Sequence, residues 1–179
     1  MTKQIIKLGA ILCAITFIVV LLLSIVNFVT ADIIYENAVK AENAAKAELI
    51  DADSFNDMGE GIFIALKGGK CVGYCVKAET KGYGGALKLL VGFDEKLKLS
   101  GIKITESQET AGLGSKAGEP SFSEALRGKE PLLKVKKNGG AGKSEVDAIS
   151  GATITSTAVV NAINESYKEL CARLEGVKK

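Results

Sequence analysis

The chain contains no histidine and no tryptophan, and only four of its 179 residues are cysteine. Histidine and cysteine are common ligands of zinc and other transition metals, so this composition argues against a metal site. The absence of histidine also removes the usual base that activates a nucleophilic serine or threonine. A net charge of +2 gives no argument for a nucleic acid partner, and we expect none.

The cysteines are poorly placed for a disulfide bond. Cys71 and Cys75 form the closest pair, in a segment with the pattern of a β-strand. A strand would place them on one face, about 13 Å apart, which is too far for a disulfide bond. We expect both to be ordinary half-buried thiols.

Charged residues are absent from Leu8–Val29. As a helix this segment is about 33 Å long, enough to cross a bilayer. Lys3 and Lys7 precede it, and Asp32 and Glu36 follow, so the positive-inside rule predicts a cytoplasmic N-terminus. A cleaved signal peptide is the alternative, because "VTA" before Asp32 fits a cleavage site. The apolar run is longer than a typical signal core, so we expect an uncleaved single-pass anchor in the cell membrane.

We divide the chain into four parts. Residues 1–7 form a cytoplasmic tail, residues 8–30 a transmembrane helix, residues 31–50 a helical connector and residues 51–179 an extracytoplasmic domain. The connector is rich in alanine, glutamate and lysine and contains no glycine or proline, which favours a helix. The remainder has the size of a single domain.

The first half of this domain has the pattern of a β-meander. Glycines at 68 and 69 and other short polar connections separate the strand-like segments, which predicts antiparallel pairing. These segments are Ile62–Lys67, Lys70–Glu79, Ala86–Phe93 and Leu99–Thr105.

The second half predicts helices beside this sheet. After a glycine-rich loop, "SFSEALRG" predicts a short helix with a serine N-cap, and "LLKVKK" predicts a strand. Apolar residues at helical spacing predict an amphipathic helix from about Ser156 to Leu174. The fold class we expect is α+β: an N-terminal transmembrane helix, then an antiparallel sheet with flanking helices.

Two short segments suggest activities that the sequence does not support. "GGAGKS", residues 139–144, lacks the first glycine of a Walker A loop, because Lys137 occupies that position. We interpret it as a flexible hairpin turn. "SGAT" does not match the nucleophile elbow of serine hydrolases, and without histidine it would need an unusual Ser–Lys pair.

Two other motifs carry a family resemblance. "DAISGAT", residues 147–153, matches the Asp-x-x-Ser/Thr-Gly-Ala-Thr motif at which flavin transferases attach FMN through its phosphate. "ETAGLG", residues 109–114, is similar to the Glu-Thr-Pro-Gly-Leu-Gly loop of the same family. Over essentially its whole length the chain resembles the G subunits of the Rnf complex, a membrane electron-transfer machine. The C subunit of the sodium-pumping NADH:quinone oxidoreductase is a close relative.

The chain departs from the family pattern at two positions. Ala111 stands where the family usually has proline, which leaves the loop slightly less rigid. Gln108 stands where a histidine is common, so a ring-nitrogen contact to the flavin is not available.

The resemblance implies a covalent FMN on Thr153. A separate flavin transferase forms the phosphoester, so the missing histidine is no obstacle. The start of the C-terminal helix offers free N–H groups to a phosphate. On composition alone, the hydroxyl cluster at 153–157 would be only a helix N-cap. The resemblance implies cofactor contacts from Ser150, Gly151, Ala152, Thr155 and Ser156, from Glu109, Thr110, Gly112, Leu113 and Gly114, and from Lys134 and Lys136.

Several of these residues have a more specific expected role. Asp147 is expected to serve recognition by the flavin transferase. Thr155, Ser156 and Thr157 are expected to cap the C-terminal helix or to bind phosphate oxygens. The loop at 109–114 is expected to lie against the isoalloxazine ring.

The resemblance further implies an electron carrier without catalytic activity of its own. The complex transfers electrons between ferredoxin and NAD and moves Na⁺ or H⁺. The expected partners are the other Rnf subunits, including the integral membrane ones, and the flavin transferase. Three alternatives stay open. They are the quinone-reductase C subunit, which usually has a larger external part, a flavin-binding assembly or sensory module without redox turnover, and a plain structural subunit.

Overall fold

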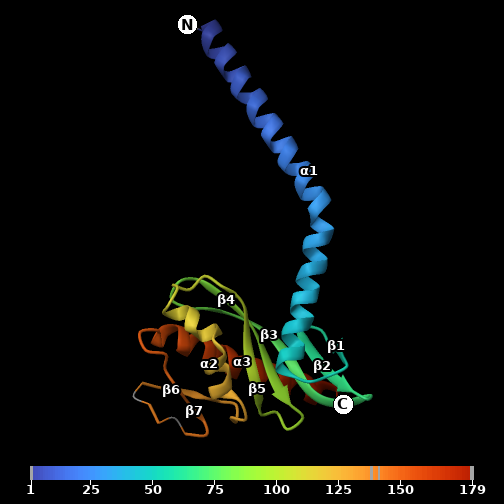
Figure 1. Ribbon diagram of the computed structural model, residues 1–179, viewed down its shortest axis with the longest axis vertical. Coiled ribbons are helices and arrows are strands. Elements are labelled where there is room, and N and C mark those ends of the chain that lie inside the picture. Colours follow the sequence, from blue (N-terminus) through green and yellow to red (C-terminus); the bar gives the residue numbers. More distant parts are fainter. Residues whose placement is uncertain (1, 138, 141, 178–179) are drawn as a thin grey trace. The chain divides into compact units, whose positions relative to one another are not determined.

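The computed structural model describes residues 2–137, 139–140 and 142–177 (Figure 1). Its first element, α1 (Thr2–Leu49), is one helix that includes both the expected transmembrane segment and the expected connector. It is long and apolar enough to cross a membrane. The chain forms two compact units, residues 1–41 and residues 42–179. The last two turns of α1 therefore belong to the second unit.

The second unit is built on a five-stranded antiparallel meander in the order β1-β2-β3-β4-β5. The four expected strands are confirmed, and β1 is an additional strand that the sequence analysis did not predict. Gly68 and Gly69, with φ of 56° and 76°, form the tight turn between β2 and β3. The strands are β1 (Ser54–Asp57), β2 (Ile62–Lys67), β3 (Lys70–Lys81), β4 (Ala86–Asp94) and β5 (Leu99–Ser107).

Both faces of this sheet are buried. Ile62 and Val76 belong to the core beneath α3 (Thr153–Val177), whereas Phe63 and Cys75 pack against the end of α1. Neighbouring residues of a strand point to opposite faces, so each pair serves two separate cores. This double burial explains why β4 is almost continuously apolar.

The helix α2 (Pro120–Leu126) closes the β5 side of the domain (Figure 1). The Ser123 hydroxyl donates to the Ile102 carbonyl and accepts from the Ile102 N–H, at 2.8 and 3.0 Å. The expected serine N-cap is wrong. Glu119 occupies the N-cap position without a side-chain bond, and Pro120 begins the helix, where its missing N–H costs nothing.

The short strands β6 (Lys134–Lys136) and β7 (Glu145–Asp147) pair in parallel. The expected hairpin at "GGAGKS" is therefore wrong, although residues 138 and 141 lie outside the described residues. Hydrogen bonds from residues outside "GGAGKS" hold β6 and β7 in place. Asn164 of α3 makes two hydrogen bonds to the backbone of Leu133, at 2.8 and 2.9 Å, and the Ala148 N–H donates to the Lys136 carbonyl.

Candidate functional site

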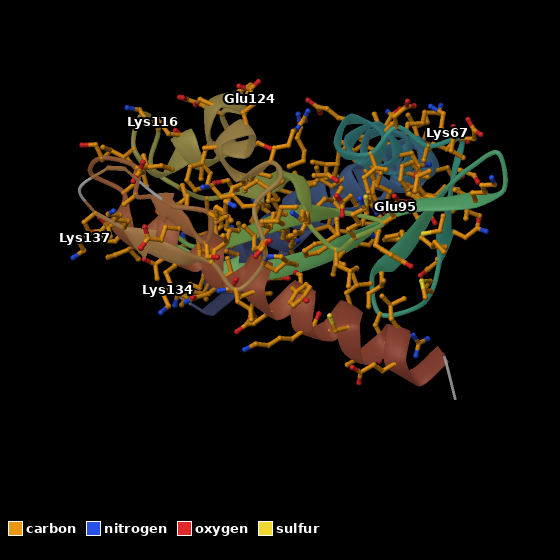
Figure 2. All side chains as sticks on the ribbon, turned by 90° about the horizontal axis from the view of Figure 1, so that it is seen from below. Lys67, Glu95, Lys116, Glu124, Lys134 and Lys137 are labelled. Carbon is orange, nitrogen blue, oxygen red and sulfur yellow. The ribbon has the colours of Figure 1, made fainter. Side chains whose placement is uncertain are left out.

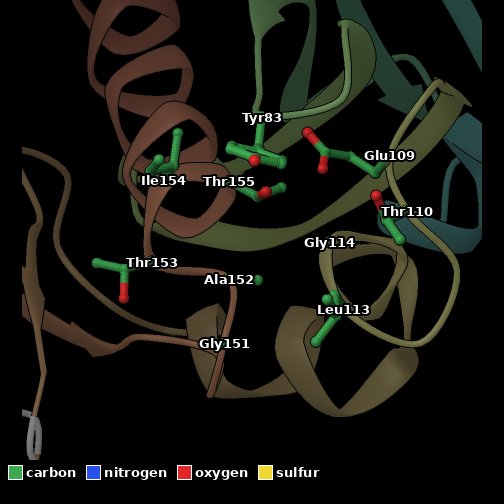
Figure 3. A pocket seen from close by; sticks show the side chains of 10 residues that line it. All are labelled: Tyr83, Glu109, Thr110, Leu113, Gly114, Gly151, Ala152, Thr153, Ile154 and Thr155. Carbon is green, nitrogen blue, oxygen red and sulfur yellow. The ribbon is translucent and has the colours of Figure 1, made fainter.

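A cavity of about 420 Å³ lies between the 109–114 loop and the residues around Thr153 (Figure 3). The structure thus brings together the two motifs that the sequence singled out. The volume is within the range of small-molecule sites in proteins. The cavity is lined by Tyr83, Glu109, Thr110, Leu113, Gly114, Gly151, Ala152, Thr153, Ile154 and Thr155.

Glu109 joins the motif loop to the β3–β4 turn. Its carboxylate accepts a hydrogen bond from the Gly84 N–H at 3.3 Å. A Cβ atom built at Gly82 or at Gly114 would collide with this carboxylate. Glycine at both positions therefore makes room for Glu109, which keeps the loop next to Tyr83. The loop continues into the 3₁₀ helix η1 (Gly114–Gly118).

The turn before α3 places Thr153 at the cavity. Gly151 has a φ of 77°, a backbone conformation that favours glycine, and the Ala152 N–H donates to the Ile149 carbonyl at 2.9 Å. The helix α3 begins at Thr153, three residues earlier than we expected. Thr153 is thus the first residue of a long helix, where backbone N–H groups remain free and the helix dipole is positive.

This earlier start overturns the expected capping role of Thr155, Ser156 and Thr157, which all lie inside the helix. Ser156 is fully buried. Its hydroxyl accepts from the Ile149 N–H at 3.0 Å and donates to the Ala152 carbonyl at 2.9 Å, so it fixes the turn. Thr155 is 1% exposed and lines the cavity, and its hydroxyl has no hydrogen-bond partner among the described residues. A buried hydroxyl left unpaired costs about 1–3 kcal/mol.

Six of the expected cofactor-binding or recognition residues do not line this cavity. The Gly112 N–H donates to the Ser115 hydroxyl at 2.9 Å. Lys136 donates to the Gly140 carbonyl at 3.0 Å and lies 3.6 Å from Glu145. The side chain of Lys134 projects from the surface of the domain (Figure 2). The six residues are Gly112, Lys134, Lys136, Asp147, Ser150 and Ser156.

Two lining residues, Tyr83 and Ile154, were missed by the sequence analysis. Tyr83 belongs to "KGYGG", where an aromatic side chain between glycines was a usable signal. Among the described residues from Glu42 onward, the large apolar side chains exposed to solvent are Tyr83, Leu113, Leu132 and Ile154. Three of these four line the cavity. An exposed apolar cluster of this kind marks a binding surface.

A second cavity of about 350 Å³ shares Thr153 and Ile154 with the first. It is also lined by Thr80, Lys81 and Asn161, together with Thr157 and Ala158. Lys81 is the cationic side chain among these residues, and Thr153 borders both cavities. Lys81 of β3 is therefore the basic residue that lines this second cavity, at a position where the sequence showed no motif.

Comparison with known proteins identifies the family. Residues 82–168 match the FMN-binding domain family, and residues 1–49 match the RnfG N-terminal region. The G subunit of the proton-translocating ferredoxin:NAD(+) oxidoreductase complex of Clostridium ljungdahlii is 34% identical, over 86% of this chain and 85% of that protein. The G subunit of the Na(+)-translocating complex of Acetobacterium woodii is 33% identical, over 93% and 91%. The chain belongs to this family of G subunits.

Solved structures support the relationship to the C subunits. The C subunit of the Na(+)-translocating NADH-quinone reductase of Parabacteroides distasonis is 30% identical, with a TM-score of 0.52, over 59% of this chain and 57% of that one. NqrC of Shewanella oneidensis gives the same TM-score at 23% identity, over 59% and 54%, and shows the shared fold alone. The family resemblance and the α+β fold are thus confirmed. The chain thus belongs to the family of G subunits of ion-translocating ferredoxin:NAD oxidoreductase (Rnf) complexes and contains an FMN-binding domain.

Proposed function

We propose that this G subunit is a membrane-anchored electron carrier with one FMN attached through its phosphate to Thr153. The observation that carries the proposal is that Thr153 begins α3 and lines the cavity formed by both motifs. Thr153 is half-exposed, so a flavin transferase could reach its hydroxyl. A phosphoester requires only this hydroxyl on the acceptor protein, which is compatible with a chain that lacks histidine.

The residues around Thr153 fit FMN chemically. An isoalloxazine ring has apolar faces and one polar edge, and the cavity offers both apolar and polar groups. Tyr83, Leu113 and Ile154 supply exposed apolar surface, while Glu109 and Thr155 supply polar groups. The free N–H groups at the start of α3 favour a phosphate on Thr153.

A bound FMN would supply reversible electron uptake, and the chain would supply binding, orientation and tuning of the potential. The glycines that make room for Glu109 keep the 109–114 loop in place against the ring. Lys81, on the other side of Thr153, would offset the negative charge of the phosphate. We propose this role for Lys81 in preference to Lys134 and Lys136, which do not line either cavity.

We propose that α1 anchors this carrier in the cell membrane with a cytoplasmic N-terminus. The apolar part of α1 supports a single span, and the flanking Lys3 and Lys7 support the orientation. The FMN-binding domain would then lie outside the cytoplasm, where a covalent tether prevents loss of the flavin. A reporter that works only outside the cytoplasm should be active when it follows Lys179. Activity only with a cytoplasmic reporter would refute the orientation.

The attachment site is tested with Thr153→Ala, with Thr157→Ala as the matched control. We expect Thr153→Ala protein to fold and to show no flavin fluorescence after denaturation and washing, whereas Thr157→Ala protein retains it. The wild-type mass should exceed the chain mass by one FMN less one water, located on the peptide that contains Thr153. Flavin that remains on denatured Thr153→Ala protein would refute the site.

The same variant tests the redox role. A complex assembled with Thr153→Ala protein should lose ferredoxin-dependent NAD reduction. If a flavin-free complex kept full activity, the domain would be an assembly or sensory module instead of an electron carrier.

A further inference from the structure

Thr155, Ser156 and Thr157 follow Thr153 in the first turns of α3, and the hydroxyl of Thr155 differs from the other two. Ser166, farther along α3, is also buried without a hydrogen-bond partner among the described residues, but it lines neither cavity, whereas Thr155 lines the cavity that both motifs form. Ser156 and Thr157 each donate to the carbonyl four residues earlier, at 2.9 and 2.8 Å. This is the usual way in which a helix satisfies a serine or threonine hydroxyl. The corresponding carbonyl for Thr155 belongs to Gly151, which precedes the helix in a turn with a φ of 77°. The Thr155 hydroxyl makes no such bond.

A buried hydroxyl without a partner is uncommon in a folded protein and requires a reason. Thr155 is 1% exposed, so bulk water does not reach its hydroxyl. Thr155 lines the cavity together with Tyr83 and Glu109, and Figure 3 shows its side chain extending from α3 toward the side of the cavity where these two residues lie. A hydrogen-bond acceptor brought by a ligand in this cavity would satisfy the hydroxyl. Tyr83, which lines the same cavity, is 74% exposed, so its ring is not held in place by burial.

We infer that the Thr155 hydroxyl is the hydrogen-bond donor to an acceptor atom on the polar edge of the isoalloxazine ring. This inference rests on the proposed function, because Thr153 tethers the same FMN two residues earlier. Side chains two residues apart on a helix do not face each other, yet Thr153 and Thr155 both line the cavity, so one can hold the tether while the other contacts the ring. The ribityl chain of FMN connects the two positions.

Thr155 is therefore a positioning residue that also tunes the flavin, and it neither caps α3 nor binds the phosphate. A hydrogen bond to the ring changes the electronic distribution of the flavin. It should affect the visible spectrum and the midpoint potential, which a purely structural threonine would not influence.

The first experiment compares three variants of the full-length protein, each checked for attached flavin after denaturation. Thr155→Val removes the hydroxyl and keeps the shape, Thr155→Ser keeps the hydroxyl, and Thr157→Val removes a hydroxyl that is already paired within the helix. We expect Thr155→Val to shift the visible spectrum and the midpoint potential. Thr155→Ser and Thr157→Val should leave both unchanged.

The second experiment measures thermal stability with and without the flavin. In the Thr153→Ala background, which carries no tether, Thr155→Val should raise Tm by roughly 3 °C or more, because it removes an unpaired buried hydroxyl. In the flavin-loaded protein the same substitution should lower Tm, because it removes a bond. Thr157→Val should have the same sign in both backgrounds.

The outcomes separate the inference from the proposed function. If the wild-type protein carries no attached flavin, the proposed function and the inference are both refuted. If the wild type is loaded but Thr155→Val keeps its spectrum and potential, or changes Tm in the same direction in both backgrounds, only the inference is overturned. If Thr155→Val does not load, the flavin-free arm decides, and an unchanged or lower Tm there overturns the inference.

Discussion

Leu113 and Gly151 are direct neighbours across the cavity, although one belongs to the 109–114 loop and the other to the turn before α3. A Cβ atom at Gly151 would lie 3.1 Å from Cδ2 of Leu113. A side chain at position 151 would therefore crowd Leu113, and glycine avoids this contact. This contact gives a physical reason for the two motifs to occur together, beyond the backbone conformation that Gly151 adopts.

The Gly151→Ala substitution should lower the free energy of unfolding more than a glycine-to-alanine substitution at another position with a similar positive φ. The φ of 77° disfavours any side chain, at a cost of about 1–2 kcal/mol, and crowding against Leu113 should add about 1 kcal/mol or more. Gly128→Ala is the matched control, because Gly128 has a φ of 75° and no atom within 4 Å of its Cβ position. Urea unfolding measures the loss of stability in each of the two variants. Equal losses of stability would show that Leu113 exerts no constraint.

Tyr83 should affect the flavin without supporting the fold. It is 74% exposed and lines the cavity, so we expect Tyr83→Ala to change the free energy of unfolding by less than about 0.5 kcal/mol. The visible spectrum and the fluorescence of the bound flavin should change, because an aromatic wall of the cavity is lost. Leu132→Ala, at an exposed apolar position outside the cavity, should change neither. A Tyr83→Ala spectrum identical to that of the wild type would argue against this placement of the ring.

The sequence was sufficient for the features that depend on local patterns. The Gly68-Gly69 turn and the alternation along β2 and β3 predicted the meander, because both signals come from neighbouring residues. The two motifs identified most of the cavity lining for the same reason. Strands β1 and β7 are too short for a pattern to be visible, with four and three residues.

Other features depend on contacts between distant residues, so the sequence did not reveal them. The start of α3 resembles a capping cluster, because Thr153, Ile154 and Thr155 are β-branched and weak helix formers. Ser156 fixes that start through the Ile149 N–H and the Ala152 carbonyl. Lys134 and Lys136 were expected to contact the cofactor, yet both belong to β6, which pairs with β7, and neither lines either cavity.

Cys75 should resist alkylation in the folded protein. It is fully buried between the sheet and the end of α1, and burial raises the pKa of its thiol to about 12. Only the thiolate reacts with iodoacetamide, so at pH 8 we expect Cys75 to be labelled after unfolding and not before. Mass spectrometry of the labelled peptides would separate it from the half-buried Cys71 and Cys171. Rapid labelling of native Cys75 would contradict this packing.

Removal of the Glu42 charge should weaken the attachment of the last turns of α1 to the sheet. Lys46 is only 3% exposed, and its ammonium lies 2.6 Å from the Glu42 carboxylate and 3.3 Å from the centre of the Phe63 ring. Glu42 also pairs with Lys77 at 2.8 Å. Glu42→Gln leaves a buried cation without its counter-ion, which should cost about 1–3 kcal/mol, because Phe63 still faces the ammonium.

The ion pairs of Glu42 with Lys46 and Lys77 also predict how the contribution of Glu42 to stability depends on pH. Burial works to raise the pKa of Glu42, but the hydrogen bonds and charges of Lys46 and Lys77 outweigh it and hold the pKa below its usual 4.5. A carboxyl whose pKa is lowered by folding stabilises the protein above its unfolded pKa and loses that contribution as the pH falls through the folded value. The stability difference between wild type and Glu42→Gln should therefore be full at pH 6 and should shrink below about pH 4.5.

Glu48→Gln is the control, because Glu48 pairs with Lys103 at the surface and should contribute under about 1 kcal/mol at any pH. A Glu42→Gln difference that stays constant down to pH 3 would show that the carboxylate charge does not hold Lys46 in place.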